Sequence, residues 1–237
     1  MIREAIILAG GLGTRLRDAV PDLPKCMAPV LAKPFIGYVI DSLLEKGIEH
    51  FICCLGYKHA IIKQYLNTQY GSLSITYSIE EEPLGTGGAI QLACGLTKVK
   101  SVLVVNGDTF FNADIKQMSA FHDHHRSLCT LALKPMQHFD RYGAVQLHID
   151  NSLEGFEEKR YQESGLINGG VYVLQVAAFL LEQMPLKFSF ENDYLEKNVK
   201  FGRFYGFVQD KYFIDIGIPE DYEKAQTELI QNIKPNA

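Results

Sequence analysis

The chain has 237 residues, of which 47% are hydrophobic, and a formal net charge of −5. Its length suits a single globular domain with a sizeable core, and its negative charge argues against a surface for nucleic acid or anionic membranes. The sequence has neither an apolar stretch of transmembrane length nor the pattern of a signal peptide, so we expect a cytoplasmic protein.

The first half of the chain alternates apolar runs with amphipathic segments. Strands are predicted at residues 5–8, 51–55, 75–79 and 102–105, and helices at residues 34–46, 59–67 and 88–96. Pro34 suits a first helical turn, and Gly47 suits the position just past a helix end. This βαβ rhythm predicts a doubly wound sheet that binds ligands at the carboxyl ends of its strands.

From about residue 128 the pattern changes to more strands and fewer helices. Strands are predicted at residues 128–133, 144–148, 153–157 and 170–174. A final amphipathic helix starts at Pro219 and carries Tyr222, Ala225 and Leu229 on one face. We therefore expect a single domain, 1–237, whose second half lies as a lobe across the first. No hexapeptide repeat follows, so we expect no appended β-helix.

A glycine-rich loop at residues 9–15 follows the first predicted strand, with Lys25 a short way downstream. Glycines let the backbone turn sharply and bring its N–H groups close to an anion, while Arg15 and Lys25 can follow a polyphosphate. The loop lacks the Gly-Lys-Ser/Thr of a Walker loop and the third glycine of a dinucleotide fingerprint. We predict a nucleoside triphosphate site.

Residues 80–88 combine three carboxylates with a second glycine-rich turn. Carboxylates would repel a phosphate, but one carboxylate can accept both the N1–H and the exocyclic amino donors of guanine. Uracil and thymine pair an N–H with carbonyls, which suits an amide side chain better. We therefore predict that Glu80 reads guanine, with Glu82 as the second candidate. The alternative is that both are solvated loop charges.

Two aspartates directly follow apolar runs: Asp108 in VVNGD and Asp215 in FIDIG. Open α/β sheets place functional groups at the carboxyl ends of their strands. Two such carboxylates suit Mg²⁺, which takes oxygen ligands and keeps waters and substrate phosphates in its shell. We favour this metal site over the alternative that each aspartate caps a following helix.

Three strings between the aspartates, RYG at 141–143, FEEK at 156–159 and NGGVY at 168–172, offer groups for a phosphorylated sugar. The Gly143 backbone, Glu158 and Asn168 supply donors and acceptors for hydroxyls, and Lys159 supplies a cation for the phosphate. Alone, each string has a plainer interpretation, since a Glu-Lys pair is usually surface charge and Asn-Gly-Gly is usually a turn.

Histidines and cysteines supply no further predicted site. The HDHH run at 122–125 follows an amphipathic helix, and we expect a solvated helix end rather than a metal site. Cys26, Cys53, Cys54, Cys94 and Cys129 are odd in number and lack metal-ligand spacing, so we expect reduced thiols. Cys53 and Cys54 should point to opposite faces of a strand. The aromatic residues of 201–212 are candidates for core packing or for a subunit contact in a homo-oligomer.

In their order along nearly the whole chain, these strings resemble the sugar-1-phosphate nucleotidylyltransferase family. The family pattern has a glycine-rich loop with Arg, then Pro-Lys, Leu-Gly-Thr, Gly-Asp, Glu-Lys, Asn-Gly/Ala-Gly and Asp-Ile-Gly-Thr-Pro. The chain departs mildly from it where Ile218 replaces the commoner Thr and Gly11 replaces the frequent Ala. The resemblance implies a Rossmann-like nucleotidyltransferase fold. It would have a mixed, mainly parallel sheet, a nucleotide-binding half at about 1–127 and a sugar-binding half at about 128–237.

The resemblance also implies roles by position. Arg15, Lys25 and Asp108 would be catalytic, and Asp108 and Asp215 would hold Mg²⁺. Gly143, Glu158, Lys159 and Asn168 would hold the sugar phosphate. The nucleotide would contact Leu8, Gly10, Gly11, Gly13, Thr14, Arg15, Lys25, Glu80, Glu82, Gly85, Thr86, Gly88 and Asp108.

The implied reaction transfers GMP from GTP to a sugar 1-phosphate and releases pyrophosphate. The resemblance favours a heptose 1-phosphate, with mannose 1-phosphate, or uridylyl or thymidylyl transfer, as the alternative. The attacking phosphate oxygen is already ionised at neutral pH, so we expect positioning and charge neutralisation rather than a general base. A regulatory subunit of the same fold fits less well because Arg15, Lys25, Asp108 and Asp215 are all present. A nicotinamide-dependent dehydrogenase fits less well because the third glycine is missing.

Overall fold

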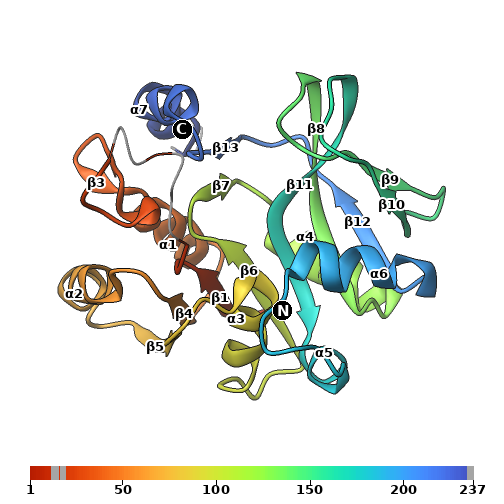
Figure 1. The fold of residues 1–237 in the computed structure, drawn as a ribbon, viewed down its shortest axis with the longest axis horizontal. Helices are drawn as coiled ribbons and strands as arrows, with labels where there is room; N and C mark the ends of the chain where they lie inside the picture. The colour runs from red at the N-terminus through yellow and green to blue at the C-terminus, as the bar shows by residue number, and fades with distance from the viewer. Residues whose placement is uncertain (12–15, 17–19, 234–237) are drawn as a thin grey trace.

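The centre of the molecule is a seven-stranded sheet (Figure 1), seen in a computed structural model that describes residues 1–11, 16 and 20–233. The strands of this sheet are β1 (Glu4–Leu8), β4 (His50–Leu55), β5 (Ser74–Ile79), β6 (Ser101–Asn106), β8 (Cys129–Phe139), β11 (Gln162–Gln175) and β12 (Phe204–Val208). Their spatial order is β12-β8-β11-β6-β1-β4-β5. β11 runs antiparallel to β6 and β8, and the other neighbours are parallel. The predicted mixed, mainly parallel sheet is confirmed.

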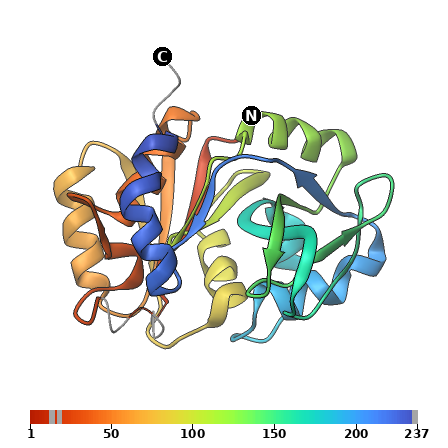
Figure 2. The ribbon, with the colours of Figure 1, turned by 90° about the horizontal axis from the view of Figure 1, so that it is seen from above.

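Helices cover both faces of the sheet. One face carries α1 (Phe35–Glu45), α2 (His59–Gln69), α4 (Ile115–His125) and α7 (Pro219–Ile233). The other carries α3 (Gly85–Cys94), α5 (Val176–Leu181) and the π-helix η3 (Phe190–Leu195). In Figure 2, the green helix α4 and the yellow helix α3 lie on opposite sides of the sheet. The predicted doubly wound arrangement is therefore present.

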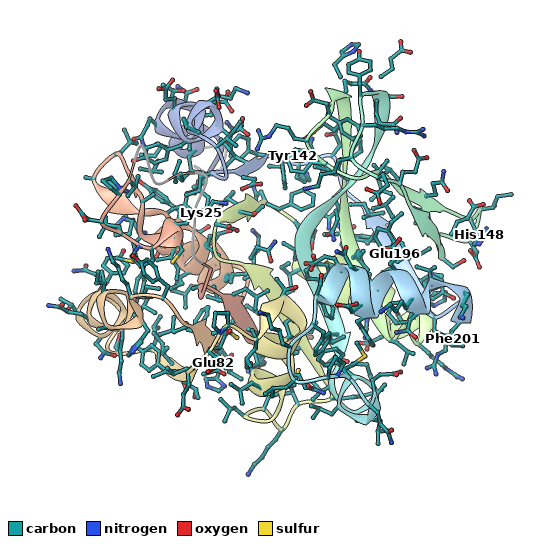
Figure 3. The ribbon with its side chains drawn as sticks, in the orientation of Figure 1. Lys25, Glu82, Tyr142, His148, Glu196 and Phe201 are labelled. Carbon is teal, nitrogen blue, oxygen red and sulfur yellow. The ribbon has the colours of Figure 1, made fainter. Side chains whose placement is uncertain are left out.

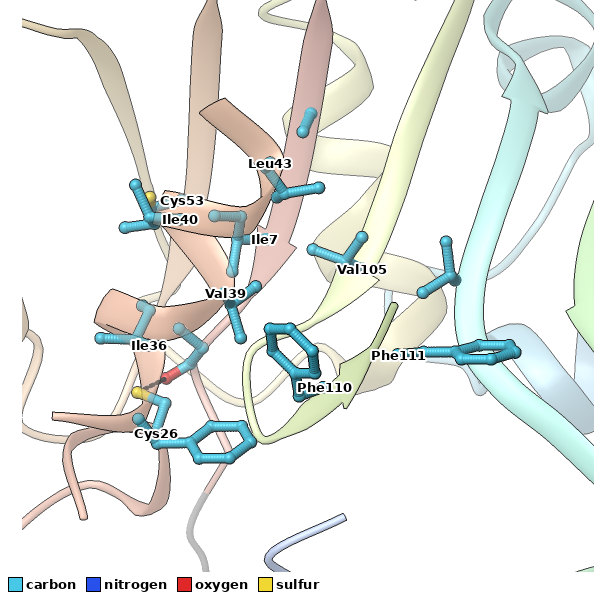
Figure 4. Packing of buried hydrophobic residues seen from close by; sticks show 14 of the residues in the cluster. Ile7, Cys26, Ile36, Val39, Ile40, Leu43, Cys53, Val105, Phe110 and Phe111 are labelled. Carbon is cyan, nitrogen blue, oxygen red and sulfur yellow. Dashed lines mark hydrogen bonds between the residues drawn. The ribbon is translucent and has the colours of Figure 1, made fainter. Parts of the chain in front are cut away.

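Successive side chains of the central strands enter opposite cores, because a strand points its side chains alternately to its two faces. Ile7, Cys53 and Val105 lie in the core beneath α1 (Figure 4), whereas the preceding Val104 and the following Cys54 lie in the core beneath α3. Burial on both faces explains the continuous apolar runs in the sequence. The predicted opposite orientation of Cys53 and Cys54 is confirmed.

All five cysteines are buried free thiols. Burial raises the pKa of the Cys53 thiol to about 12 and also raises the pKa of Cys26, so both are held in the unreactive thiol form.

The predicted elements differ from the observed ones chiefly at their ends. α3 begins at Gly85 rather than at Gly88, because the loop before η3 fixes its first turn: the Gly87 N–H donates to the Phe188 carbonyl at 3.0 Å. β8 and β11 extend well beyond their apolar segments and pair along residues 134–139, which are too polar to suggest a strand.

Short elements complete the chain. Two-stranded ribbons are formed by β2 (Pro29–Val30) with β3 (Lys33–Pro34), β7 (Thr109–Phe111) with β13 (Phe213–Asp215), and β9 (Val145–Leu147) with β10 (Leu153–Phe156). The short helical turns named among the described residues are η2 (Lys25–Met27), α6 (Glu196–Asn198) and η4 (Val199–Phe201). Among the residues that the structure describes, no helix combines the length and the apolar character needed to cross a membrane.

Candidate active site

A lysine and two aspartates from distant parts of the chain meet beside the carboxyl end of β6. Lys25 Nζ donates to Asp108 Oδ2 at 2.7 Å and to Asp215 Oδ1 at 3.2 Å. Asp108 is the second residue after β6, and Lys25 opens the turn η2. Asp215 reaches them because β13 pairs with β7, which sets Asp215 opposite Thr109. The two aspartates predicted to act together are therefore adjacent.

The charges of this cluster do not cancel. Burial alone would lower the pKa of Lys25, but the carboxylates of Asp108 and Asp215 outweigh it and raise that pKa, so the ammonium stays charged. Two carboxyl groups share this one ammonium, and burial raises the pKa of the Asp215 carboxyl although Lys25 opposes it. The donors are all carboxylate oxygens and already share one cation, so the site fits a hard divalent ion that completes its shell with phosphates and water.

Gly217 packs closely against this cluster. A Cβ at Gly217 would lie 3.0 Å from Asp215 Oδ1 and 3.1 Å from Lys25 Nζ. A side chain there would require the carboxylate and the ammonium to shift by a few tenths of an ångström. This contact gives a physical reason for the glycine in the FIDIG string.

A cavity of about 690 Å³ opens on one side of the cluster, between the carboxyl ends of β1, β4 and β5 and the start of α3. Predicted nucleotide residues that line it are Leu8, Gly10, Gly11, Glu80, Glu82, Gly85, Thr86 and Asp108. Gly88 is buried in α3 instead, against the Leu186 carbonyl. Gly13, Thr14 and Arg15 lie outside the described residues.

Glu80 has a more constrained place in this cavity than Glu82. Its Oε2 accepts from the Leu84 N–H at 3.0 Å, and its Oε1 lies where a Cβ on Gly10 would be only 2.9 Å away. The side chain is half-buried, and this burial raises the pKa of the Glu80 carboxyl. Glu82 is exposed on the loop between β5 and α3 (Figure 3). Of the two predicted base readers, only Glu80 is held in one orientation by the backbone.

A second cavity, of about 370 Å³, lies on the other side of the cluster. All four predicted sugar-phosphate residues, Gly143, Glu158, Lys159 and Asn168, line it. Asp215 lines this cavity and Asp108 lines the first one, so Lys25 bridges the two. A nucleotide-sized space and a sugar-sized space therefore meet at the carboxylates.

The bend in β11 shapes the wall between the two cavities. Gly170 has a φ of +69°, and a Cβ there would lie 2.6 Å from Asn106 Nδ2. Asn168 Oδ1 accepts from the Gly170 N–H at 3.1 Å, and Asn168 Nδ2 donates to the Tyr172 hydroxyl at 3.0 Å. The Asn-Gly-Gly string is thus a break in strand register that turns the Asn168 side chain into the second cavity.

Several lining residues were not predicted from sequence. Asn106 lines both cavities, and Tyr142, labelled in Figure 3, lines the second. Both stand within strings that the sequence marked, so their neighbours could have indicated them. Tyr57 and His59 in the first cavity and Glu191 in the second have no local sequence signal.

The prediction of a solvated helix end at 122–125 is wrong for His122. His122 is 2% exposed, with Nδ1 3.0 Å from Thr130 Oγ1 and Nε2 3.4 Å from Ser101 Oγ. Burial lowers its pKa to about 4. The helix α4 turns His122 inward because it packs on the sheet through that face. No group of three metal-ligating side chains occurs in the described part of the chain, there or elsewhere.

Aromatic residues of the 201–212 segment do pack internally. Phe204 is buried against Tyr194, and Tyr205 and Phe207 contact Phe121 of α4. Phe201 is exposed on η4 (Figure 3).

The chain belongs to the nucleotidyl transferase family, whose model matches residues 4–232. It is 51% identical to the D-glycero-α-D-manno-heptose 1-phosphate guanylyltransferase of Aneurinibacillus thermoaerophilus, over 95% of this chain and 98% of that protein. It is 44% identical to the enzyme of the same name from Campylobacter jejuni, over 92% of this chain and 96% of that protein.

Solved structures agree with this assignment. HddC from Yersinia pseudotuberculosis, complexed with GMP-PN, superimposes with a TM-score of 0.87 and 36% identity, over 96% of this chain and all of that one. A putative glucose-1-phosphate thymidylyltransferase from Bacillus anthracis superimposes with a TM-score of 0.81 at 22% identity, a likeness of fold alone. The Rossmann-like nucleotidyltransferase fold is thereby confirmed.

Proposed function

We propose that this protein transfers GMP from GTP to D-glycero-α-D-manno-heptose 1-phosphate, giving GDP-heptose and pyrophosphate. The observation that carries the chemistry is the meeting of two cavities, of about 690 and 370 Å³, at Lys25 and its two aspartates. The choice of nucleotide and sugar is supported by the 51% and 44% identical guanylyltransferases.

The nucleotide is proposed to occupy the larger cavity, with its base at Glu80. The carboxylate accepts the two adjacent donors of guanine, which uracil and thymine lack. Backbone N–H groups of Gly10, Gly11 and Gly13, with the Thr14 hydroxyl, contact the triphosphate. Arg15 neutralises the departing pyrophosphate. Gly85 and Thr86 border base and ribose. Of the other predicted contacts, Leu8 lines the same cavity and Gly88 is buried in α3.

The sugar phosphate is proposed to occupy the smaller cavity, where Gly143, Glu158 and Asn168 meet its hydroxyls and Lys159 meets its phosphate. The division at about residue 127 is supported by the cavity walls. The larger cavity is lined only from residues 8–108, and the smaller mainly from residues 142–215. We place this reaction in the cytoplasm.

Asp108 and Asp215 are the proposed ligands of Mg²⁺, which when bound neutralises charge on the reacting phosphates. Lys25 stands between the carboxylates and beside the larger cavity, where its ammonium reaches the α-phosphate. The sugar phosphate oxygen attacks the α-phosphorus in line with the leaving pyrophosphate, and no proton has to move. The cluster thus stabilises charge rather than acting as a base.

A non-catalytic regulatory subunit of this fold is disfavoured because Lys25, Asp108 and Asp215 are in contact. The reaction is tested by pyrophosphate release with Mg²⁺, across GTP, ATP, UTP, CTP and dTTP, against heptose, mannose and glucose 1-phosphates. Turnover with GTP and the heptose phosphate is the expected result. Turnover with mannose 1-phosphate alone would correct the sugar, and turnover with UTP or dTTP would overturn the base assignment. No turnover from folded protein would favour the regulatory subunit.

A further inference from the structure

Glu191 stands between the two cavities and has no role in the function proposed above. It lies in the first turn of η3 and lines the smaller cavity together with Asn168 and Tyr172. It is half-buried, and no cation pairs with it among the ion pairs of the described residues. A carboxylate of this kind needs hydrogen-bond donors, so its partners indicate what it can still bind.

The carboxylate is held by three neutral hydroxyls. Glu191 Oε2 accepts from Thr86 Oγ1 at 2.7 Å and from Ser189 Oγ at 3.2 Å. Glu191 Oε1 accepts from the Tyr172 hydroxyl at 3.3 Å. An ionised carboxylate offers about four lone-pair sites, so these three bonds leave one on Oε1.

The direction of these hydrogen bonds is fixed by their other ends. Thr86 Oγ1 accepts from the Phe190 N–H at 2.9 Å, and the Tyr172 hydroxyl accepts from Asn168 Nδ2 at 3.0 Å. Each hydroxyl has one hydrogen, and each already donates it to Glu191. The Glu191 edge of the cavity therefore presents only an acceptor, whereas Asn168 retains one N–H and one lone pair for a ligand.

We propose that Glu191 is a specificity-determining residue that accepts a hydrogen bond from one hydroxyl of the sugar, a role that rests on the function proposed above. The same carboxylate binds Thr86 in the wall of the nucleotide cavity, so it fixes the sugar hydroxyl relative to the nucleotide. A hydrogen bond to a charged acceptor supplies about 10- to 100-fold in selectivity over a sugar that lacks the hydroxyl.

Glu191→Gln is the sharpest test because it keeps the shape of the side chain and replaces one acceptor oxygen by an amide donor. The amide oxygen can still accept from Thr86 and Ser189, and the Tyr172 hydroxyl has a second lone pair for the amide N–H. The face toward the cavity changes from acceptor to donor, and the Tyr172 hydroxyl accepts a hydrogen bond from the amide instead of donating one to Oε1. Glu196→Gln is the matched control, because it removes one carboxylate charge from the lining of the same cavity outside the hydrogen-bond network of Glu191.

The experiment measures kcat/KM for wild type and both variants with GTP and Mg²⁺, using heptose 1-phosphate and each of its monodeoxy derivatives. Thermal unfolding first establishes that each variant is folded. We expect the kcat/KM of the wild type to be about 10- to 100-fold lower with one of the derivatives than with the parent sugar. With the parent sugar, kcat/KM of Glu191→Gln should be lower than that of the wild type by a similar factor, mainly through the KM for the sugar. With that one derivative, the variant and the wild type should have almost the same kcat/KM. Glu196→Gln should keep the wild-type pattern of kcat/KM across the sugars.

The inference would be overturned if Glu191→Gln lowered kcat/KM equally for every sugar. It would also be overturned if the substitution raised the KM for GTP as much as the KM for the sugar. Either result would mean that Glu191 serves only to anchor η3. These outcomes differ from failure of the proposed function, in which the wild type itself does not turn over heptose 1-phosphate. If the wild type uses mannose 1-phosphate instead, the same comparison is made with its monodeoxy derivatives.

Discussion

Lys25 Nζ lies 2.7 Å from Asp108 Oδ2 and so occupies part of the space in which a metal ligated by Asp108 would sit. The ammonium also reaches Asp215 Oδ1 at 3.2 Å. A lysine held in this way offsets one of the two carboxylate charges in the free protein, and it would have to give up part of this contact for a divalent ion to bind the same oxygens. Lysine and metal therefore compete for the carboxylates, and this competition can be measured.

Lys25→Met should have opposite effects on catalysis and on metal binding. We expect turnover to fall by about 100-fold or more, because a preorganised cation is lost from the reacting phosphates. The affinity of the nucleotide-free protein for Mn²⁺ should rise, because two carboxylates then face the ion alone. Pyrophosphate release and the electron paramagnetic resonance signal of free Mn²⁺ measure the two effects. Lys33→Met is the control, since Lys33 pairs with Asp41 and lines neither cavity. A weaker Mn²⁺ affinity in Lys25→Met would contradict the competition.

Glu80→Gln should change nucleotide choice and remove one pH dependence. The amide cannot accept both guanine donors, so we expect the KM for GTP to rise by about tenfold or more and selectivity over UTP to fall. Because burial raises the pKa of Glu80, the wild type should lose GTP affinity at a higher pH than an exposed glutamate would, as the carboxylate becomes protonated.

Titration of GTP affinity from pH 7.5 to pH 4.5 measures this effect. The GTP affinity of Glu80→Gln should not fall at acid pH as that of the wild type does. Glu82→Gln is the matched control, because Glu82 is exposed. This variant should keep both the selectivity for GTP and the fall of GTP affinity at acid pH. Equal effects of the two substitutions would contradict the special place of Glu80.

Gly217→Ala should reduce activity without unfolding the protein. Its Cβ would lie within 3.1 Å of the Lys25 ammonium and push the cluster apart, so we expect turnover to fall by about tenfold or more. Gly155→Ala is the control, because a Cβ at Gly155 would lie 3.8 Å from its nearest described neighbour, Gln146 Oε1, and Gly155 lines neither cavity. Activity assays and circular dichroism on both variants provide the comparison. Full activity in Gly217→Ala would mean that the cluster can relax.

His122 should make the protein acid-sensitive. Its folded-state pKa, about 4, is below the 6.5 of an ordinary histidine, so the unfolded chain binds more protons between these values. The contribution of neutral His122 to the unfolding free energy is then fully present above about pH 6.5. It is lost as the pH falls toward 4, which lowers the unfolding free energy by about 3 kcal/mol in total. Urea unfolding of wild type and His122→Asn at pH 7.5, 5.5 and 4.5 tests this. The difference in unfolding free energy between the two proteins should shrink as the pH falls, and a constant difference would contradict the prediction.

Sequence patterns predicted the sheet because its strands are buried on both faces, and such runs stand out as continuous apolar segments. Asp108 and Asp215 could be predicted because strand ends mark functional positions in open sheets. Glu191 could not, because its role comes from contacts with Thr86 and Tyr172, which are brought together only by tertiary packing.

The burial of His122 could not be predicted for a related reason. Three histidines around an aspartate suggested a polar surface, whereas the orientation of each side chain depends on which face of α4 meets the sheet. The long pairing of β8 with β11 also escaped prediction. Residues 134–139 are held as a strand by their partner rather than by their own apolar character.

The pairing of β7 with β13 has a consequence for synthesis on the ribosome. Lys25 and Asp215 are 190 positions apart, and only that pairing brings the second carboxylate to the first. A nascent chain that has passed β6 contains most of the residues that line the larger cavity, but not Asp215. We therefore expect the cation-binding centre to form only after residues 213–215 have left the exit tunnel and β13 has paired with β7.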